Sequence, residues 1–524
     1  MTAKLVIVYH RQPYEEVIED GKLVRKENKS PNGIVPTLKS FFGRHDSGAW
    51  IAWKYADDPT DPDFERRVTI EDSYGTYTVS RLPLTKEQVS SFYHVTSKEA
   101  IWPILHSFKD RYNYDPVDWP TFREVNWAFA EAAAHEADDD SVIWVHDYNL
   151  WLVPAYVRRL KPKAKIAFFH HTPFPAADMF NVLPWRREII ESLLDCDIVG
   201  FHIPRYAANF VSTAFSRFDI EVTLREKTRE DFSPQGQALS EQATPTEIAY
   251  QGRRIQLSSF PVGVDVEFIE ELTARPETAA LEGQIREELA GKKLIISVGR
   301  TDYTKGGIEL LQAYERLLQR QPDLSGQVRL MHVSVSANRN MEAYAEVQEA
   351  IEAMAGRING TYGSFEWQPV SLISTPIPFP ELVAYYRAAD IAWITPLADG
   401  LNLVAEEFVA ARTDGDGVLV LSEFAGVAVE MAEAVLCNPF SHRSMDAAIE
   451  QALTMDEADR RARMRALRAK VHRYDIEAWA REQQRLFDLI AGDGPAGGAA
   501  DGAADGAANG AAALSRPGVI TAMR

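Results

Sequence analysis

Short runs of β-branched and aromatic residues alternate along the chain with longer stretches in which apolar residues recur at helical spacing. This alternation is typical of parallel sheets whose strands are joined by crossover helices. The segment 260–265, Phe-Pro-Val-Gly-Val-Asp, has the proline and glycine of a boundary and divides the pattern into two similar halves. We therefore expect an α/β fold with two doubly wound domains, 1–262 and 263–492, that face each other across a cleft. The expected strands are 5–9, 142–145, 166–169, 198–201, 294–298, 328–333, 391–394 and 418–421, and the expected helices include 119–134, 206–216, 309–318, 341–358 and 401–411.

Two segments depart from this pattern. Residues 223–247 are polar and rich in turn formers, which predicts an excursion on the first domain. From Asp493 onward the chain is built largely of Ala, Gly and Asp, a composition that cannot bury a core. We expect the tail 493–524 to be disordered, and the last helix before it to pack back on the N-terminal domain.

Composition and charge narrow the class of protein. A chain of 524 residues exceeds the ~250–300 residues at which one core stops growing. A net charge of -20 argues against nucleic acid as a partner. The two cysteines, Cys196 and Cys437, lie far apart beside apolar residues, which favours a reducing compartment over a disulfide framework. No run reaches the ~18 apolar residues that span a bilayer, and the first apolar run, 5–9, is too short for a signal peptide. We expect a cytoplasmic protein.

The segment 299–307, Gly-Arg-Thr-Asp-Tyr-Thr-Lys-Gly-Gly, places two cations between an expected strand and a glycine pair that opens a helix. Arg300 and Lys305 singly are more often surface cations. Here the positive end of a helix adds to their charge, which suits a diphosphate. Because no Asp-x-Asp motif follows a strand, these cations take the place of a divalent ion, and we expect no metal or other cofactor.

A second segment, 399–407, reads Asp-Gly-Leu-Asn-Leu-Val-Ala-Glu-Glu. Asp399 stands on a turn before a helix with free N–H groups, and Glu407 lies on its second turn, at a distance suited to ribose hydroxyls. The ordinary alternative is a pair of acidic residues favoured near a helix start. The apolar surroundings of both carboxylates favour hydrogen bonds to sugar hydroxyls, so the two segments together predict a nucleotide-sugar pocket.

Polar residues also follow the strands of the first half. His171 ends the run 166–169 and precedes Thr-Pro-Phe-Pro, which fixes an extended turn, although a histidine there is more often a core residue. Asp147 ends the preceding strand and is alternatively the cap of a helix near residue 149. Arg11 follows the first strand. The turn glycine Gly33 could admit a phosphate or simply form a turn, and Tyr93, Trp102 and Trp50 could equally be core aromatics.

The ordered motifs resemble those of retaining glycosyltransferases of the trehalose-6-phosphate synthase family, from Lys4 to about residue 492. The resemblance implies two Rossmann-like domains of GT-B type and transfer of glucose from a nucleotide to a phosphorylated acceptor with the anomeric configuration kept. The matching motifs are Trp-Val-His-Asp-Tyr at 144–148, His-Thr-Pro-Phe-Pro at 171–175, Pro-Arg-Tyr at 204–206, Pro-Val-Gly-Val-Asp at 261–265, the segment 299–306, Gly-Arg-Ile-Asn-Gly at 356–360 and the segment 395–405.

The N-terminal third departs from the trehalose-6-phosphate branch, which has Ser-Asn-Arg after the first strand and Gly-Gly-Leu in the donor loop. The segments 9–14, 30–42 and 50–54 resemble instead the glucosylglycerol-phosphate synthase branch, which joins ADP-glucose to glycerol 3-phosphate. Bulky residues there, Tyr9, His10, Pro31 and Trp53, are available to fill the space of a hexose ring, and Lys54 is a further cation. Alternatives are trehalose-6-phosphate synthase, a pseudo-glycosyltransferase acting on cyclitols, and an idle sugar-phosphate sensor. The nucleobase and the oligomeric state, a homo-oligomer included, stay open.

The resemblance also implies roles for single residues. Arg300 and Lys305 would bind the donor diphosphate and stabilise the departing charge, with a leaving-phosphate oxygen taking the acceptor proton. On the donor side, the resemblance implies that Asp399 binds glucose hydroxyls, Glu407 the ribose, and the amides around Asn402 and Leu403 the phosphates, with Gly33 lying against the donor. Asp147 and His171 would line the reacting centre. The acceptor phosphate would be bound by Arg11, Tyr93, Trp102 and Arg339, although the spacing after Arg339 is one residue shorter than in the family.

Overall fold

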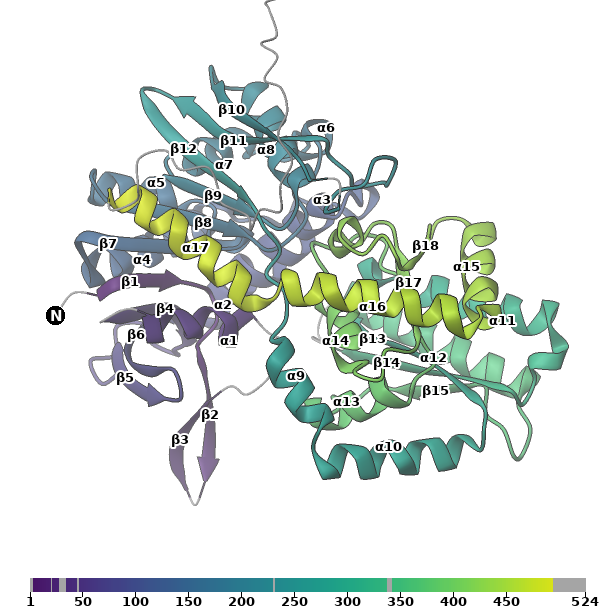
Figure 1. The fold of residues 1–524 in the computed structure, drawn as a ribbon. Helices are drawn as coiled ribbons and strands as arrows, with labels where there is room; N and C mark the ends of the chain where they lie inside the picture. Colours follow the sequence, from purple (N-terminus) through teal and green to yellow (C-terminus); the bar gives the residue numbers. More distant parts are fainter. Residues whose placement is uncertain are drawn as a thin grey trace, which may run out of the picture.

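The structure, a computed structural model, describes residues 3–19, 21–27, 34–44, 47–229, 231–336 and 342–492. Two sheets dominate it, one in each half of the chain (Figure 1). The predicted tail 493–524 lies outside the described residues. The two-domain α/β architecture expected from the alternating pattern is confirmed.

The N-terminal sheet has ten strands in the order β10-β11-β12-β9-β8-β7-β1-β4-β6-β5. The seven strands from β12 to β6 pair in parallel, because crossover helices return the chain to the same edge. The strand order reverses between β7 and β1, so the carboxyl ends of these two strands border a crevice. The strands are β1 Ala3–Val8, β4 Gly48–Tyr55, β5 Arg67–Asp72, β6 Gly75–Leu84, β7 Ala137–His146, β8 Lys165–His170, β9 Ile198–Phe201, β10 Glu221–Lys227, β11 Ala243–Tyr250 and β12 Arg253–Ser259.

The C-terminal sheet is wholly parallel among its six strands, in the order β15-β14-β13-β16-β17-β18. Counted from its first strand this order is 3-2-1-4-5-6, the doubly wound order of dinucleotide-binding sheets. Its switch point lies between β13 and β16. The strands are β13 Lys293–Thr301, β14 Val328–Ser336, β15 Val370–Ile373, β16 Ile391–Ile394, β17 Val418–Ser422 and β18 Val435–Cys437.

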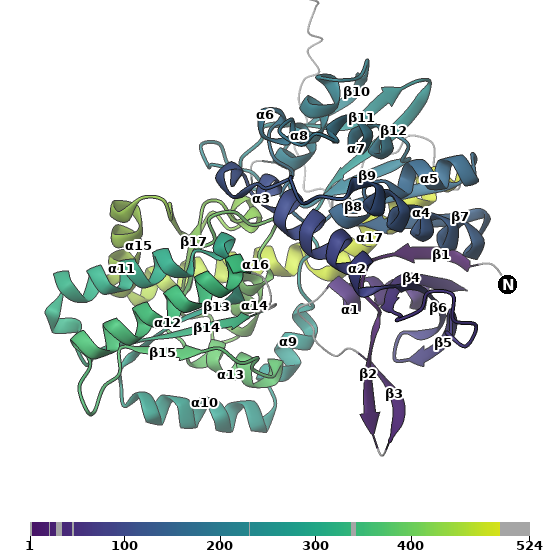
Figure 2. The same ribbon diagram turned by 180° about the vertical axis from the view of Figure 1, so that it is seen from behind.

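Helices cover both faces of each sheet. In the N-terminal domain α4 (Trp119–Glu136) and α5 (Val153–Leu160) cover one face, seen in front in Figure 2, and α17 (Ile476–Ala491) crosses the other (Figure 1). Trp479 of α17 stacks on Trp144 of β7 with ring centroids 5.4 Å apart, so the end of the chain packs on the first domain. The other helices are α1 Ile34–Lys39, α2 Lys86–Val89, α3 Trp102–Leu105, α6 Ala177–Phe180, α7 Arg186–Leu193, α8 Pro204–Phe215, α9 Val266–Thr273, α10 Pro276–Leu289, α11 Gly307–Arg320, α12 Glu342–Tyr362, α13 Phe379–Ala388, α14 Leu403–Ala411, α15 His442–Thr454 and α16 Glu457–Arg473.

The chain crosses between the domains twice, and the two crossings touch. Gly263 has a φ of 70°, and a Cβ there would collide with the carbonyl oxygen of Tyr474. The backbone N–H of Ile476 donates to the carbonyl of Val264 at 3.2 Å. Glycine at the predicted boundary is therefore required by close backbone approach.

The predicted strands leave out β4, β5, β6, β12, β15 and β18, and also two polar strand regions. The polar segment 223–247 runs from β10 through a long connection into β11, and these two antiparallel strands extend the N-terminal sheet. A hairpin of β2 (Tyr14–Glu19) and β3 (Lys22–Glu27) projects from the body beside β4 to β6 (Figure 1). Strands β2, β3 and β10 carry charged residues on each side and lack the buried face that makes a strand visible in sequence, whereas β11 buries part of its length.

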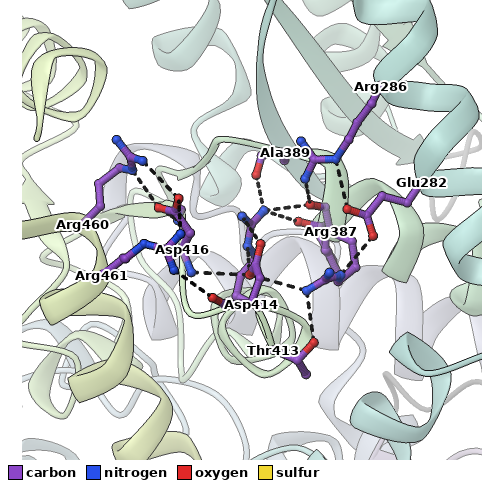
Figure 3. Close-up of polar contacts among 12 residues, drawn as sticks. Glu282, Arg286, Arg387, Ala389, Thr413, Asp414, Asp416, Arg460 and Arg461 are labelled. Atoms are coloured by element: carbon purple, nitrogen blue, oxygen red, sulfur yellow. Dashed lines mark hydrogen bonds and ion pairs between the residues drawn. The ribbon is translucent and has the colours of Figure 1, made fainter. Parts of the chain in front are cut away.

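A network of arginines and carboxylates fixes the C-terminal end of α14 (Figure 3). The buried guanidinium of Arg412 donates to the carbonyl of Arg387 at 3.0 Å and to both carboxylate oxygens of Asp414 at 3.1 and 3.0 Å. Arg387 pairs with Glu282 of α10 at 3.1 Å. Because α14 also carries candidate site residues at its N-terminal end, this network holds the site from the opposite end of the helix.

Candidate functional site

The segment after β13 forms one wall of the C-terminal switch point. The Asp302 carboxylate accepts from the N–H of Thr304 at 2.9 Å and shapes a tight turn, after which α11 begins at Gly307. Gly306 has a φ of 68°, and a Cβ there would collide with the carbonyl of Thr395. The cations Arg300 and Lys305 line one cavity with the first residue of α11, as predicted. This arrangement presents cations and free helical N–H groups together.

The segment after β16 supplies the opposite wall. Lys305 Nζ lies 2.7 Å from Asp399 Oδ2, and Asn402 Nδ2 donates to the same oxygen at 2.9 Å. Burial alone would raise the pKa of Asp399, but the charge of Lys305 and the two hydrogen bonds hold it below its usual value. Asn402, with a φ of 97°, also caps α14 by accepting from the N–H of Ala405 at 3.1 Å. The two predicted motifs are thus joined by an ion pair that the sequence does not reveal.

Glu407 lies one turn into α14 and is buried. The hydroxyl of Tyr386 donates to one of its oxygens at 3.1 Å, and the other oxygen has no partner among the described residues. Burial raises the pKa of Glu407 to about 8. The amides at Leu403 and the residues after it open the same helix, so Asp399, Asn402, Leu403 and Glu407 share one end of α14.

The N-terminal domain meets this loop directly. Gly400 packs so closely on the backbone of His171 and Thr172 that a Cβ would lie 2.5 Å from the His171 carbonyl oxygen. The hydroxyl of Tyr206 donates to the backbone carbonyl of Asp399 at 3.0 Å. The loop around Asp399 and Gly400 in one domain and the end of β8 in the other therefore form a single site.

Asp147 and His171 lie at the ends of β7 and β8. Asp147 has a φ of 69° and its carboxylate accepts from the N–H of Tyr148 at 3.0 Å, so it is both a cap and a cleft residue. Burial raises its pKa to about 6. His171 Nε2 lies 3.1 Å from His146 Nδ1, and burial lowers the pKa of His171 far enough to keep the ring neutral. The pair brings a carboxylate and an imidazole to the same edge.

The predicted acceptor residues gather at the end of β1. Arg11 donates to the hydroxyl of Tyr93 at 3.4 Å, and Trp102 is buried behind them. Lys98, which the sequence analysis did not single out, places its Nζ 3.7 Å from the centroid of the Trp102 ring. Its signal in sequence is the four-residue spacing to Trp102. Lys98 also borders a cavity of about 370 Å³ whose other wall includes Tyr303 of the C-terminal domain.

Four further candidate residues stand apart from these groups. Gly33 and Arg339 lie outside the described residues. Trp50 is a core residue whose indole N–H donates to the carbonyl of Arg11 at 2.8 Å. Lys54 pairs with Glu16 at 2.5 Å, so its charge is already compensated.

Two kinds of feature are absent from the part of the chain that the structure describes. No group of three or more His, Cys, Asp or Glu residues in that part of the chain is arranged to hold a metal ion. None of the helices there combines the length and apolar character needed to cross a bilayer.

Two doubly wound domains whose switch points face each other across a cleft form the architecture of a GT-B glycosyltransferase. Residues 3–488 match glycosyltransferase family 20. Glucosylglycerol-phosphate synthase of Synechocystis sp. is 50% identical, over 94% of this chain and 100% of that protein. Trehalose-6-phosphate synthase of Mycolicibacterium gilvum is 36% identical, over 91% and 92%. A solved α,α-trehalose-phosphate synthase (UDP-forming) from Burkholderia xenovorans in complex with glucose 6-phosphate has a TM-score of 0.78 at 28% identity, over 93% of this chain and 100% of that one.

The chain belongs to glycosyltransferase family 20, and it is a glycosyltransferase. The family resemblance found in the motifs is therefore confirmed.

Proposed function

We propose that this enzyme transfers glucose from ADP-glucose to glycerol 3-phosphate with retention, giving 2-O-α-glucosylglycerol 3-phosphate for compatible-solute synthesis. The observation that carries the proposal is the identity of 50% to a glucosylglycerol-phosphate synthase over nearly the whole chain, against 36% to a trehalose-6-phosphate synthase. The departing N-terminal segments agree with it, because two of their bulky residues lie beside a candidate acceptor residue: His10 stacks on Tyr93, and Tyr9 packs against His10.

In this proposal the donor lies in the C-terminal switch point. Arg300, Lys305 and the start of α11 bind the diphosphate, and Asp399 binds glucose hydroxyls. The amides at Asn402 and Leu403 bind phosphate. Glu407 binds the ribose, for which its neutral or ionised carboxyl is equally suited. When the diphosphate binds, Lys305 is shared between it and Asp399.

The acceptor enters from the end of β1, where Arg11, Lys98 and Tyr93 receive its phosphate. Negative charge develops on the leaving phosphate oxygen as the glycosidic bond breaks, and Arg300 and Lys305 stabilise it from fixed positions. The same oxygen takes the proton of the attacking hydroxyl on the front face of the sugar. Asp147 and His171 border the reacting carbon. No side chain acts as nucleophile, and no metal is required.

The test is an incubation of the enzyme with ADP-, UDP- or GDP-glucose against glycerol 3-phosphate or glucose 6-phosphate, with mass analysis of the products. We expect glycerol 3-phosphate to be used at least ~10²-fold better by kcat/KM, about 2.7 kcal/mol of differential transition-state binding. The Arg300→Ala protein, purified identically, controls for contaminating transferases. Equal or better use of glucose 6-phosphate would restore the trehalose branch, and failure with both acceptors despite intact donor binding would favour a cyclitol acceptor.

A further inference from the structure

His10 stands at the end of β1 with both ring nitrogens buried, and neither has a hydrogen-bond partner among the described residues. Its ring stacks on Tyr93 with centroids 5.5 Å apart and meets the edge of Tyr9 at 4.6 Å. Polar groups in a protein interior are hydrogen-bonded in the great majority of cases. Two unmatched nitrogens on one ring therefore call for a partner that the described residues do not supply.

The protonation state of His10 defines what that partner must be. Burial lowers its pKa well below the usual value, and the neighbouring charges of Arg11 and Lys98 lower it further. A neutral imidazole has one N–H donor and one acceptor nitrogen. A hydroxyl group can accept a hydrogen bond from the N–H or donate one to the other ring nitrogen, whereas an anionic oxygen can only accept from the N–H. The ring is thus suited to an alcohol.

The surroundings of His10 place this alcohol on the acceptor side. Its charged neighbours are Arg11 and Lys98, and Arg11 shares a hydrogen bond with Tyr93, on which His10 stacks. Lys305 and Asp399 belong to the other domain and are paired with each other. A ligand that reaches His10 is therefore held by the cations proposed above for the acceptor phosphate.

We propose that His10 is a specificity-determining residue that hydrogen-bonds the hydroxyl of the acceptor that does not react. This inference rests on the proposed function, in which the phosphate occupies one end of glycerol and the secondary hydroxyl attacks the donor. The remaining primary hydroxyl is then the group to which His10 forms a hydrogen bond. Its recognition selects a short polyol phosphate over an alkyl phosphate of the same length.

The test compares two acceptors, glycerol 3-phosphate and propane-1,2-diol 1-phosphate. The second keeps the phosphate and the secondary hydroxyl and lacks only the primary hydroxyl. We expect the wild-type enzyme to prefer glycerol 3-phosphate by at least ~10-fold in kcat/KM, mostly through KM, because a site built to bond a hydroxyl is left unpaired by the analogue. His10→Leu should treat the two acceptors alike to within about 2-fold, and His10→Asn, which keeps a donor and an acceptor, should restore most of the preference.

Lys98→Met is the matched control on the same pocket. It should raise KM for both acceptors equally and leave their ratio unchanged, because both carry the phosphate. Binding of ADP-glucose to the His10 variants, measured by calorimetry, should match the wild type.

The outcomes separate the two proposals. Use of glucose 6-phosphate in place of glycerol 3-phosphate by the wild-type enzyme overturns the proposed function and this inference with it. Good use of glycerol 3-phosphate with equal use of the propanediol phosphate overturns the role of His10 alone, and this result needs no variant to fold. A preference that persists in folded His10→Leu also overturns it.

Discussion

Removal of Lys305 should have two separable consequences, one for turnover and one for stability. Its ammonium is placed to stabilise the leaving diphosphate, and it also pairs with Asp399 at 2.7 Å. For turnover we expect Lys305→Ala to lose on the order of 10²-fold or more, about 2.7 kcal/mol of transition-state stabilisation, the scale of one preorganised donor to a developing charge.

The stability loss follows from the burial of the pair. Deleting one partner of a fully buried ion pair costs ~3–5 kcal/mol, and a fully exposed pair contributes at most ~1 kcal/mol. The side chains of Lys305 and Asp399 are 23% and 13% exposed, so the pair lies between these limits. Asn402 still donates to Asp399 after the change. We therefore expect Lys305→Ala to lower the free energy of unfolding by about 2 kcal/mol.

A second substitution separates the two effects. Lys305→Ala combined with Asp399→Asn removes the uncompensated carboxylate, so it should recover most of the stability and none of the turnover. Arg300→Ala is the matched control, because Arg300 has no carboxylate within 4.0 Å among the described residues. It should lose turnover to a similar degree with little change in stability. Denaturant unfolding and turnover at saturating substrates measure both quantities.

Two results would refute this reasoning. Near wild-type turnover of Lys305→Ala at saturating donor would remove the cation from the reaction. A double variant as unstable as Lys305→Ala would show that the Asp399 charge is not the source of the stability loss.

Three further predictions follow from buried charges and from the ligand sets in the described residues. Burial lowers the pKa of Lys98 to about 8, so KM for the phosphorylated acceptor should rise between about pH 7 and pH 9 in the wild type. In Lys98→Arg, which keeps its charge over this range, KM should stay flat. A flat profile in the wild type would contradict a role of Lys98 in binding the phosphate. Burial raises the pKa of both Glu406 and Glu430, which adjoin each other, so the native state binds more protons than the unfolded state above about pH 4.5 and loses stability as pH rises. Glu406→Gln should therefore be more stable than the wild type, by an amount that grows from pH 5 to pH 8 by at most about 1.4 kcal/mol per pH unit. Unfolding experiments at fixed ionic strength measure this difference. A difference that does not change with pH would show that protonation of the Glu406 carboxyl is not its cause. Dialysis against a chelator should leave turnover unchanged, whereas a loss that Mg²⁺ reverses would end the metal-free account.

The sequence predicted several strands that have a buried apolar run, but it missed others, such as β4, that have one as well. Parallel strands such as β13 and β16 are short apolar runs because both of their faces are covered. Strands β2, β3 and β10 are polar on both sides and are held by pairing with a neighbour, which no local pattern records. The same kind of pattern led to the candidate site: Arg300, Asp147 and Asp399 were proposed because each lies at or just after the end of a strand.

Contacts between distant segments were beyond the reach of such patterns. Lys305 and Asp399 are 94 residues apart in sequence, and the 2.7 Å contact between them exists only because β13 and β16 are neighbours in the sheet. Lys98 was missed because Trp102 was considered alone and not as the cation–π partner of a lysine four residues earlier. The sequence shows that His10 is bulky, but only the three-dimensional structure shows that its ring nitrogens have no hydrogen-bond partner among the described residues.

The positions of the two switch points explain why this fold suits transfer between two phosphorylated substrates. Each sheet reverses its strand order at one point, and the carboxyl ends of the strands there leave a crevice with free polar groups. One crevice has Arg300 and Lys305, and the other has Arg11 and Lys98. Gly400 contacts the backbone of His171, and Tyr206 donates to the carbonyl of Asp399, so the rims of the two crevices meet. In our proposals, acceptor choice then depends on the residues at the end of β1, where the imidazole of His10 is available to hydrogen-bond a hydroxyl.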